Sequence, residues 1–271
     1  MKIGIIGARS KHVEYFTEAI NSLSPNGSIK VSHIWGNDDP GRLDEIVSKG
    51  VVQRVFSDPG DLIKQSDAVI IVLRDGTKHF NWAEKAILAG KPVFIDKPFT
   101  CDPVEAEKLY LLSQEHNVAV TGGSTLCFIP EIANMIVPVC ESYSISYKAD
   151  LFSPYGGWYF YGSHLTDLCT TLFGGNFSSV TATLRKGCVT AKITYPGFTV
   201  TLYSSPEEQP PVFRADKEYI LDDRNCYYYG MKHFIDTIKN NFALKDKRHL
   251  ASVILLDAVL KSIKDEAPVV F

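Results

Sequence analysis

The sequence predicts an α/β protein in two parts, and two observations support this prediction. Over residues 1–121, short apolar runs rich in β-branched residues alternate with amphipathic helical patterns, and the connections are short. Such alternation is typical of a parallel, doubly wound sheet of the Rossmann type. After residue 122, polar and apolar residues alternate within the runs, as in antiparallel strands with one covered face. We therefore expect a Rossmann-type domain over 1–121 and an α+β domain with a mostly antiparallel sheet over 122–271.

The elements of the first part follow from hydrophobic periodicity. The segment 67–73 is an almost continuous apolar run, as expected for a strand buried on both faces. The segment 12–23 places Val13, Phe16 and Ile20 on one face, which predicts a helix. The same reasoning predicts strands at 2–7, 30–35, 51–56, 91–96 and 118–120, and helices at 41–49, 79–89 and 103–116. A turn is expected at 58–60, followed by a short helix that carries Leu62 and Ile63.

In the second part, five alternating runs predict strands at 143–152, 179–184, 188–195, 198–203 and 213–221. Helical patterns follow Pro130 and cover 163–173, 227–241 and 248–264. The second face of such a sheet needs a cover.

Composition narrows the class of partner. The formal net charge is −3 and no strong basic stripe is present, which argues against a nucleic-acid surface. Six scattered cysteines without a C-x-x-C pair are typical of reduced thiols. No apolar stretch reaches about 18 residues, and the run Ile3–Ala8 is too short for a signal-peptide core. We expect a cytoplasmic protein with a small-molecule partner and without membrane contact.

The first turn, Gly7–His12, lies where a Rossmann domain presents backbone N–H groups and a helix N-terminus to a pyrophosphate. It keeps the first glycine of the G-x-G-x-x-G pattern, whereas Arg9 and His12 occupy the other two glycine positions. This context predicts a dinucleotide site that includes Gly7, Ala8, Arg9 and Ser10. The alternative is that Gly7 only permits a tight turn.

The end of the second predicted strand supplies the candidates for ribose binding. Asn37 and Asp38 follow Trp35-Gly36, where an acidic residue usually binds the ribose hydroxyls. Arg9 indicates a different cofactor, because its side chain could bind a 2′-phosphate and so favour NADP. A third interpretation is that Asp38 and Asp39 start a turn or cap the next helix.

The most specific pattern covers residues 67–98: a strand, a loop ending in His79, a helix closing with Ala-Gly-Lys, a strand, and then Asp96-Lys97-Pro98. It resembles the glucose–fructose oxidoreductase / inositol dehydrogenase / MocA family, in which the last motif reads Glu-Lys-Pro. The segment 156–167 resembles that family's G-G-G-x-L-x-D-x-G-x-H-x-x-D motif, with His164 on the family histidine and Asp167 on the final aspartate. The resemblance extends over nearly the whole chain. It implies a homodimer or homotetramer formed through the second sheet, because members of that family often bury the second face of this sheet against another subunit.

The resemblance implies an NAD(P)-dependent oxidoreductase that transfers a hydride to or from a CH–OH carbon of a sugar, cyclitol or related polyol. It implies that Lys97 and His164 serve proton transfer and substrate orientation, and Tyr161 is an adjacent candidate. His164 and Asp167 lie three residues apart, but no third ligand is evident, so no metal is expected. The expected cofactor-binding residues are Gly7, Ala8, Arg9, Ser10, Asn37, Asp38, Leu73, Arg74, His79, Asp96 and Lys97.

Several alternatives stay open at this stage. The family aspartate four residues before the histidine corresponds to Phe160, which can neither orient nor charge-balance a site. Together with the altered loop, this favours a second hypothesis, a non-catalytic relative that binds a nucleotide or sugar-like ligand as a sensor or scaffold. His79 either borders the nicotinamide or caps its helix. The aromatic residues at 158–161 either stack on a sugar ring or belong to the core.

Overall fold

The computed structural model describes residues 1–207, 209–240 and 247–271. Two compact units are formed, and neither is one continuous stretch of chain. The first comprises Met1–Thr100, Val104–Gly122 and Tyr227–Asp246, and the second comprises Cys101–Pro103, Gly123–Cys226 and Lys247–Phe271. The chain passes to the second unit after Gly122, next to the expected boundary. Helix α8 (Cys226–Lys239) then returns the chain to the first unit, which the sequence did not predict.

The first unit is built on a six-stranded sheet in which every pair is parallel. Its strand order is β3-β2-β1-β4-β5-β6, so the order reverses direction between β1 and β4. Doubly wound sheets bind ligands beyond the strand ends at such a reversal. The predicted fold class is therefore confirmed for this part. The strands are β1 (Lys2–Ile6), β2 (Lys30–Trp35), β3 (Arg54–Val55), β4 (Ala68–Ile71), β5 (Val93–Ile95) and β6 (Val120–Gly122).

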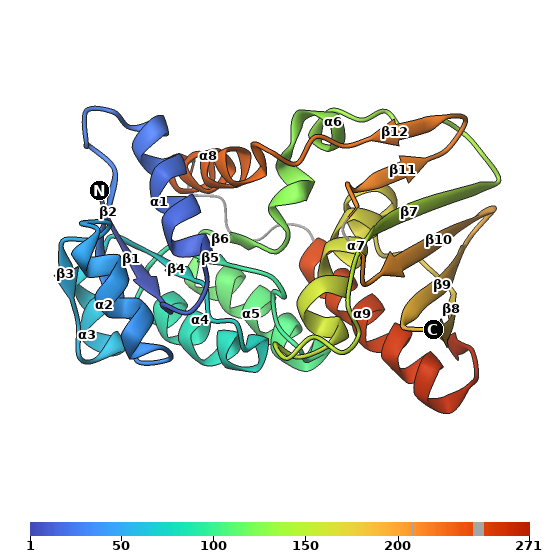
Figure 1. Cartoon of the computed structure of the whole chain (residues 1–271), viewed down its shortest axis with the longest axis horizontal. Coiled ribbons are helices and arrows are strands. Elements are labelled where there is room, and N and C mark those ends of the chain that lie inside the picture. The colour runs from blue at the N-terminus through green and yellow to red at the C-terminus, as the bar shows by residue number, and fades with distance from the viewer. Residues whose placement is uncertain (208, 241–246) are drawn as a thin grey trace. The chain divides into compact units, whose positions relative to one another are not determined.

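Helices cover both faces of this sheet (Figure 1). On one face, Phe16 of α1 and Phe234 of α8 both contact Phe94 of β5, with ring centroids 5.4 and 5.7 Å apart respectively. Helices α3 to α5 lie on the other face. The segment 58–60, predicted as a turn, instead begins a helix, because the Asp58 side chain accepts a bond from the Asp61 N–H. The helices are α1 (His12–Leu23), α2 (Pro40–Ser48), α3 (Pro59–Gln65), η1 (Gly76–Lys78), α4 (His79–Leu88), α5 (Pro103–His116) and α8.

The second unit contains a seven-stranded sheet of order β12-β11-β7-β10-β9-β8-β13. Its strand pairs are antiparallel except β7 with β10, which confirms the mostly antiparallel prediction. The predicted strand at 213–221 is two short paired strands instead, because a turn separates them. The strands are β7 (Ser142–Lys148), β8 (Ser179–Arg185), β9 (Cys188–Tyr195), β10 (Phe198–Ser205), β11 (Val212–Arg214), β12 (Glu218–Ile220) and β13 (Val269–Val270).

Helices α7 (Trp158–Phe173) and α9 (Arg248–Asp265) cover one face of this sheet. Helix α7 begins ahead of the predicted start at 163, and the short elements η2 (Thr125–Phe128) and α6 (Pro130–Ala133) precede it in the chain. The predicted end of the helix at 227–241 lies outside the described residues.

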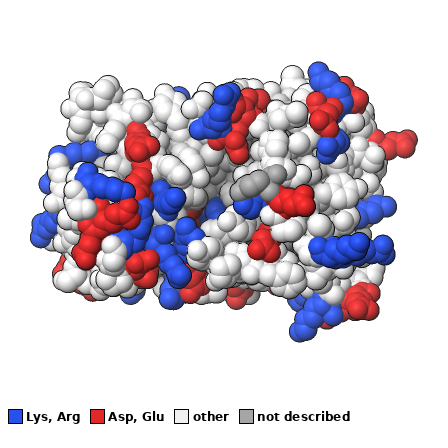
Figure 2. All heavy atoms as spheres, in the orientation of Figure 1, with Lys and Arg blue, Asp and Glu red and all other residues white. Residues whose placement is uncertain are grey.

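Positive and negative side chains are interspersed over the face drawn in Figure 2, in keeping with the small net charge. No helix of the described residues is both long and apolar enough to cross a membrane.

Candidate functional site

Gly7 forms a close turn at the end of β1 in the first unit. Its φ is +115°, and a Cβ at this position would lie 3.0 Å from the backbone nitrogen of Leu73, which follows β4. Its N–H donates to the carbonyl of Trp35 at the end of β2, at 2.8 Å. Only glycine combines this dihedral with this approach. The turn therefore joins the ends of three parallel strands, as a phosphate-binding loop requires.

Asp38 holds the same loop from the end of β2. Its carboxylate accepts bonds from the N–H groups of Ala8 at 2.8 Å and Arg9 at 3.3 Å. Asp39, rather than Asp38, caps α2, because its side chain accepts from the Arg42 N–H. The capping interpretation is therefore confirmed for Asp39, whereas Asp38 binds the loop backbone. The side chains of Arg9 and Asn37 are exposed.

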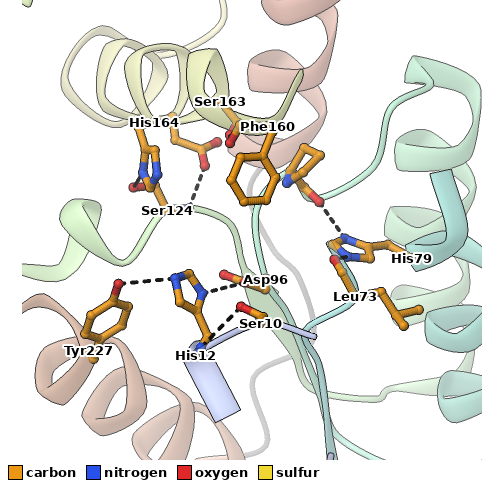
Figure 3. Close-up of polar contacts among 12 residues, drawn as sticks. Ser10, His12, Leu73, His79, Asp96, Ser124, Phe160, Ser163, His164 and Tyr227 are labelled. Atoms are coloured by element: carbon orange, nitrogen blue, oxygen red, sulfur yellow. Dashed lines mark hydrogen bonds and ion pairs between the residues drawn. The ribbon is translucent and has the colours of Figure 1, made fainter. Parts of the chain in front are cut away.

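A chain of hydrogen bonds reaches Asp96, just after β5 (Figure 3). His12 Nδ1 lies 2.6 Å from Asp96 Oδ2, and the Tyr227 hydroxyl lies 3.1 Å from His12 Nε2. Burial of Asp96 opposes its ionisation. The interactions with His12 and with the neighbouring Lys97 favour the carboxylate and outweigh burial, so the pKa of Asp96 is lowered overall. Neither His12 nor Tyr227 was among the predicted site residues, although the position of His12 in the loop was a visible departure from the glycine pattern.

Lys97 follows Asp96 and is almost fully buried, with 3% of its surface exposed. Burial disfavours the ammonium, and the positive charge of Arg74 acts in the same direction, whereas Asp96 opposes both. The net effect lowers the pKa of Lys97 to about 7. A lysine with such a pKa exchanges a proton readily near neutral pH, as a general acid or base must.

His79 is fully buried at the start of α4, and both ring nitrogens face backbone carbonyls. Nδ1 lies 2.7 Å from the oxygen of Pro98, and Nε2 lies 2.7 Å from the oxygen of Leu73 (Figure 3). The side chain does not cap α4, contrary to one expectation. A neutral imidazole has one N–H group, so it can donate a hydrogen bond to only one of these two carbonyls at a time. The ring nevertheless lies between the loop after Lys97 and the residue that follows β4.

In the second unit, His164 lies on α7. Its Nδ1 is 2.6 Å from the hydroxyl of Ser124, and its ring meets Tyr147 edge-on with centroids 5.4 Å apart. The buried Asp167, one turn further along α7, accepts a bond of 2.6 Å from the Ser124 N–H. Asp167 therefore anchors the backbone of Ser124, and the Ser124 hydroxyl orients the histidine. Sequence reasoning missed Ser124, since nothing local marks a serine that contacts a residue 40 positions away.

Phe160 lies one turn before His164 and is buried, with 8% of its surface exposed. Its ring contacts Tyr155 and Tyr161 at centroid distances of 5.2 and 4.8 Å. Trp158 is also buried, so these two members of the aromatic cluster belong to the core. Tyr161 is half-buried, and Lys148 Nζ lies 5.8 Å from its ring centroid.

Among the described residues, no group of three or more His, Cys, Asp or Glu side chains is arranged to hold a metal ion.

Comparison with known proteins gives a match for the first part of the chain. Residues 1–124 match the family described as "Oxidoreductase family, NAD-binding Rossmann fold". Inositol 2-dehydrogenase of Klebsiella pneumoniae is 35% identical over 100 residues, which are 36% of this chain and 28% of that enzyme. The match thus spans little more than a quarter of the relative's length.

Solved structures match the whole chain in fold. A scyllo-inositol dehydrogenase from Lactobacillus casei, solved with NAD(H) and scyllo-inositol, has a TM-score of 0.81 at 16% identity, covering 100% of this chain and 98% of that one. An NAD-binding oxidoreductase from Klebsiella pneumoniae has a TM-score of 0.78 at 13% identity, with coverage of 100% and 98%. At these identities, the likeness establishes a shared two-part fold.

Proposed function

Because residues 1–124 match the oxidoreductase family with an NAD-binding Rossmann fold, we propose that the chain is an NAD(P)-dependent dehydrogenase of this family. Its substrate is a secondary alcohol of a cyclitol, sugar or related polyol. The inositol dehydrogenases among its relatives support this substrate class. The observation that carries the proposal is the burial of Lys97, which stands two residues after strand β5 of the parallel sheet, and this burial lowers the pKa of the amine to about 7.

The residues present fit a dinucleotide. The turn at Gly7 follows β1 at the point where the strand order reverses, and the N-terminus of helix α1 follows the loop. When bound, the nicotinamide supplies the hydride acceptor for alcohol oxidation. The protein must then remove the hydroxyl proton, and the Lys97 amine is suited to hold it, because both protonation states are populated near pH 7.

His164 is the second proposed proton-transfer and orienting group. The hydroxyl of Ser124 at 2.6 Å from Nδ1 restricts the rotation of the ring and selects its tautomer. Asp167 has a structural part in this arrangement, since its carboxylate fixes the Ser124 backbone. Tyr161 of α7 is a weaker candidate, for a hydrogen bond to the substrate, because its side chain is only half-buried.

We further propose that NAD is preferred to NADP. The Asp38 carboxylate is held at the end of β2 by two loop N–H groups, where an acidic residue accepts bonds from ribose hydroxyls and repels a 2′-phosphate. Calorimetric titration with NADH and NADPH tests this preference. Tighter binding of NADH, with the difference reduced in Asp38→Asn, supports it, and equal binding of both cofactors to the native protein contradicts it.

Activity is tested by screening cyclitols and sugars for NAD reduction. We expect turnover with at least one polyol, and we expect Lys97→Ala to abolish kcat while cofactor affinity changes little. An unchanged kcat in Lys97→Ala would remove this residue from the mechanism.

A second candidate is a non-catalytic relative that binds a nucleotide or sugar-like ligand. Its support is Phe160, which places a buried phenyl ring where the resembling family has a carboxylate. Tight cofactor binding without turnover of any polyol would favour this candidate. Phe160→Asp then provides a direct check, because a gain of turnover would identify the missing carboxylate as the cause.

A further inference from the structure

The three side chains that meet at Asp96 come from distant parts of the first unit. His12 is the first residue of α1, Tyr227 lies in α8, and Asp96 follows β5. The distances are 3.1 Å from the Tyr227 hydroxyl to His12 Nε2 and 2.6 Å from His12 Nδ1 to Asp96 Oδ2. Figure 3 shows the imidazole between its two partners. His12 stands at a position that the dinucleotide pattern assigns to glycine. The hydrogen bonds that its side chain makes are therefore a departure from that pattern.

One tautomer satisfies both contacts. A neutral imidazole with its proton on Nδ1 donates to the Asp96 carboxylate and accepts at Nε2 from the Tyr227 hydroxyl. Ring packing holds the imidazole in this orientation: its centroid lies 5.0 Å from Tyr227 in an edge contact and 5.4 Å from Phe16. Each hydrogen bond thus points toward Asp96, and successive bonds of this kind polarise one another.

Asp96 is in turn the acidic group that favours the ammonium form of Lys97. Arg74 acts in the opposite direction and disfavours the ammonium, and the charge of Lys97 in turn affects the titration of His79. A donor on Asp96 Oδ2 disperses the carboxylate charge and weakens its attraction for the amine. The proton affinity of Lys97 therefore depends on whether His12 is bound to Asp96.

We propose that His12 is a positioning residue for Lys97: it binds the Asp96 carboxylate, with Tyr227 supporting the ring, and so sets the pH at which the Lys97 amine takes up a proton. The catalytic use of Lys97 rests on the proposed function, but the effect of His12 on its titration does not.

The test follows the 13Cε resonance of Lys97 in lysine-labelled protein between pH 5 and pH 11, assigned with Lys97→Arg. In His12→Ala we expect the titration of Lys97 to move to higher pH by up to about one unit, because only the part of the His12–Asp96 interaction that differs between the two protonation states of Lys97 contributes. His12→Asn retains an amide that can donate to Asp96 and stays near the native value. His116→Ala removes an exposed histidine of the first unit and leaves the titration unchanged.

A titration that stays in place or moves to lower pH in folded His12→Ala overturns the proposal. If circular dichroism shows that His12→Ala does not fold, Tyr227→Phe decides the question, because it removes only the hydroxyl. A shift in the same direction by a few tenths of a unit is expected there, and its absence overturns the proposal.

Once a substrate is known, the pH profile of kcat should move with the Lys97 resonance. A protein that turns over no polyol would refute the proposed function, whereas the resonance titration would still decide the role of His12.

Discussion

Lys97→Met should stabilise the protein in neutral and mildly acidic solution, and the gain should vanish in alkaline solution. The substitution keeps the length of the side chain and removes the amine. Lys97 is 3% exposed, so the native state must bury an ammonium whenever the amine is protonated. Burying a charge is costly even where a partner such as Asp96 compensates part of it.

The magnitude follows from the change in proton affinity on folding. The pKa of Lys97 falls from 10.5 to about 7, which corresponds to an upper bound of about 5 kcal/mol. Between these two values the unfolded chain binds more protons than the native state, so the contribution of Lys97 makes the free energy of unfolding rise with pH. Below about pH 7 both states are protonated and the full cost is present.

We therefore expect Lys97→Met to raise the free energy of unfolding at pH 6 by about 2 kcal/mol or more, after allowance for the favourable interaction between Lys97 and Asp96 that is lost. The gain should decline through pH 7 to 10.5 and be close to zero at its upper end.

Urea unfolding of the cofactor-free protein at pH 6, 7.5, 9 and 10.5, followed by tryptophan fluorescence, measures this change. Lys11→Met is the matched control, because Lys11 is exposed in the same unit. The control should show no comparable change with pH. A difference between Lys97→Met and the native protein that is independent of pH would refute the reasoning, since it would show that Lys97 titrates alike in both states.

Three further predictions concern other parts of the chain. Gly122→Ala should lower the free energy of unfolding by several kcal/mol, because φ is +152° and a Cβ would overlap the carbonyl oxygen of Ile95. Gly27→Ala is the control, since the space around Gly27 is open, and it should cost about 1 kcal/mol in the same chemical denaturation experiment. Equal losses would contradict this steric account. Ser124→Ala should lower kcat about tenfold by releasing the ring of His164, and an unchanged kcat would exclude an orienting role. Light scattering at micromolar concentration should show a dimer or tetramer, and a monomer would contradict the predicted assembly through the second sheet.

The architecture was largely predictable because it follows from local patterns. Continuous apolar runs predicted the parallel strands, and polar–apolar alternation predicted the antiparallel sheet. The incorrect predictions of secondary structure have local causes as well. The turn predicted at 58–60 begins helix α3, since Asp58 is its N-cap, and the strand predicted at 213–221 folds back on itself as β11 and β12.

The sequence by itself determined the class of fold, the position of the glycine turn and the candidate lysine and histidine. Only the tertiary structure decided what holds them. His12 meets Asp96 across 84 residues and Tyr227 across 215, and Ser124 meets His164 across 40. Hydrophobic periodicity specifies which face of an element is buried, but a hydrogen bond depends on distance and angle between two elements after they pack. Partners of this kind therefore emerge only when the chain has folded.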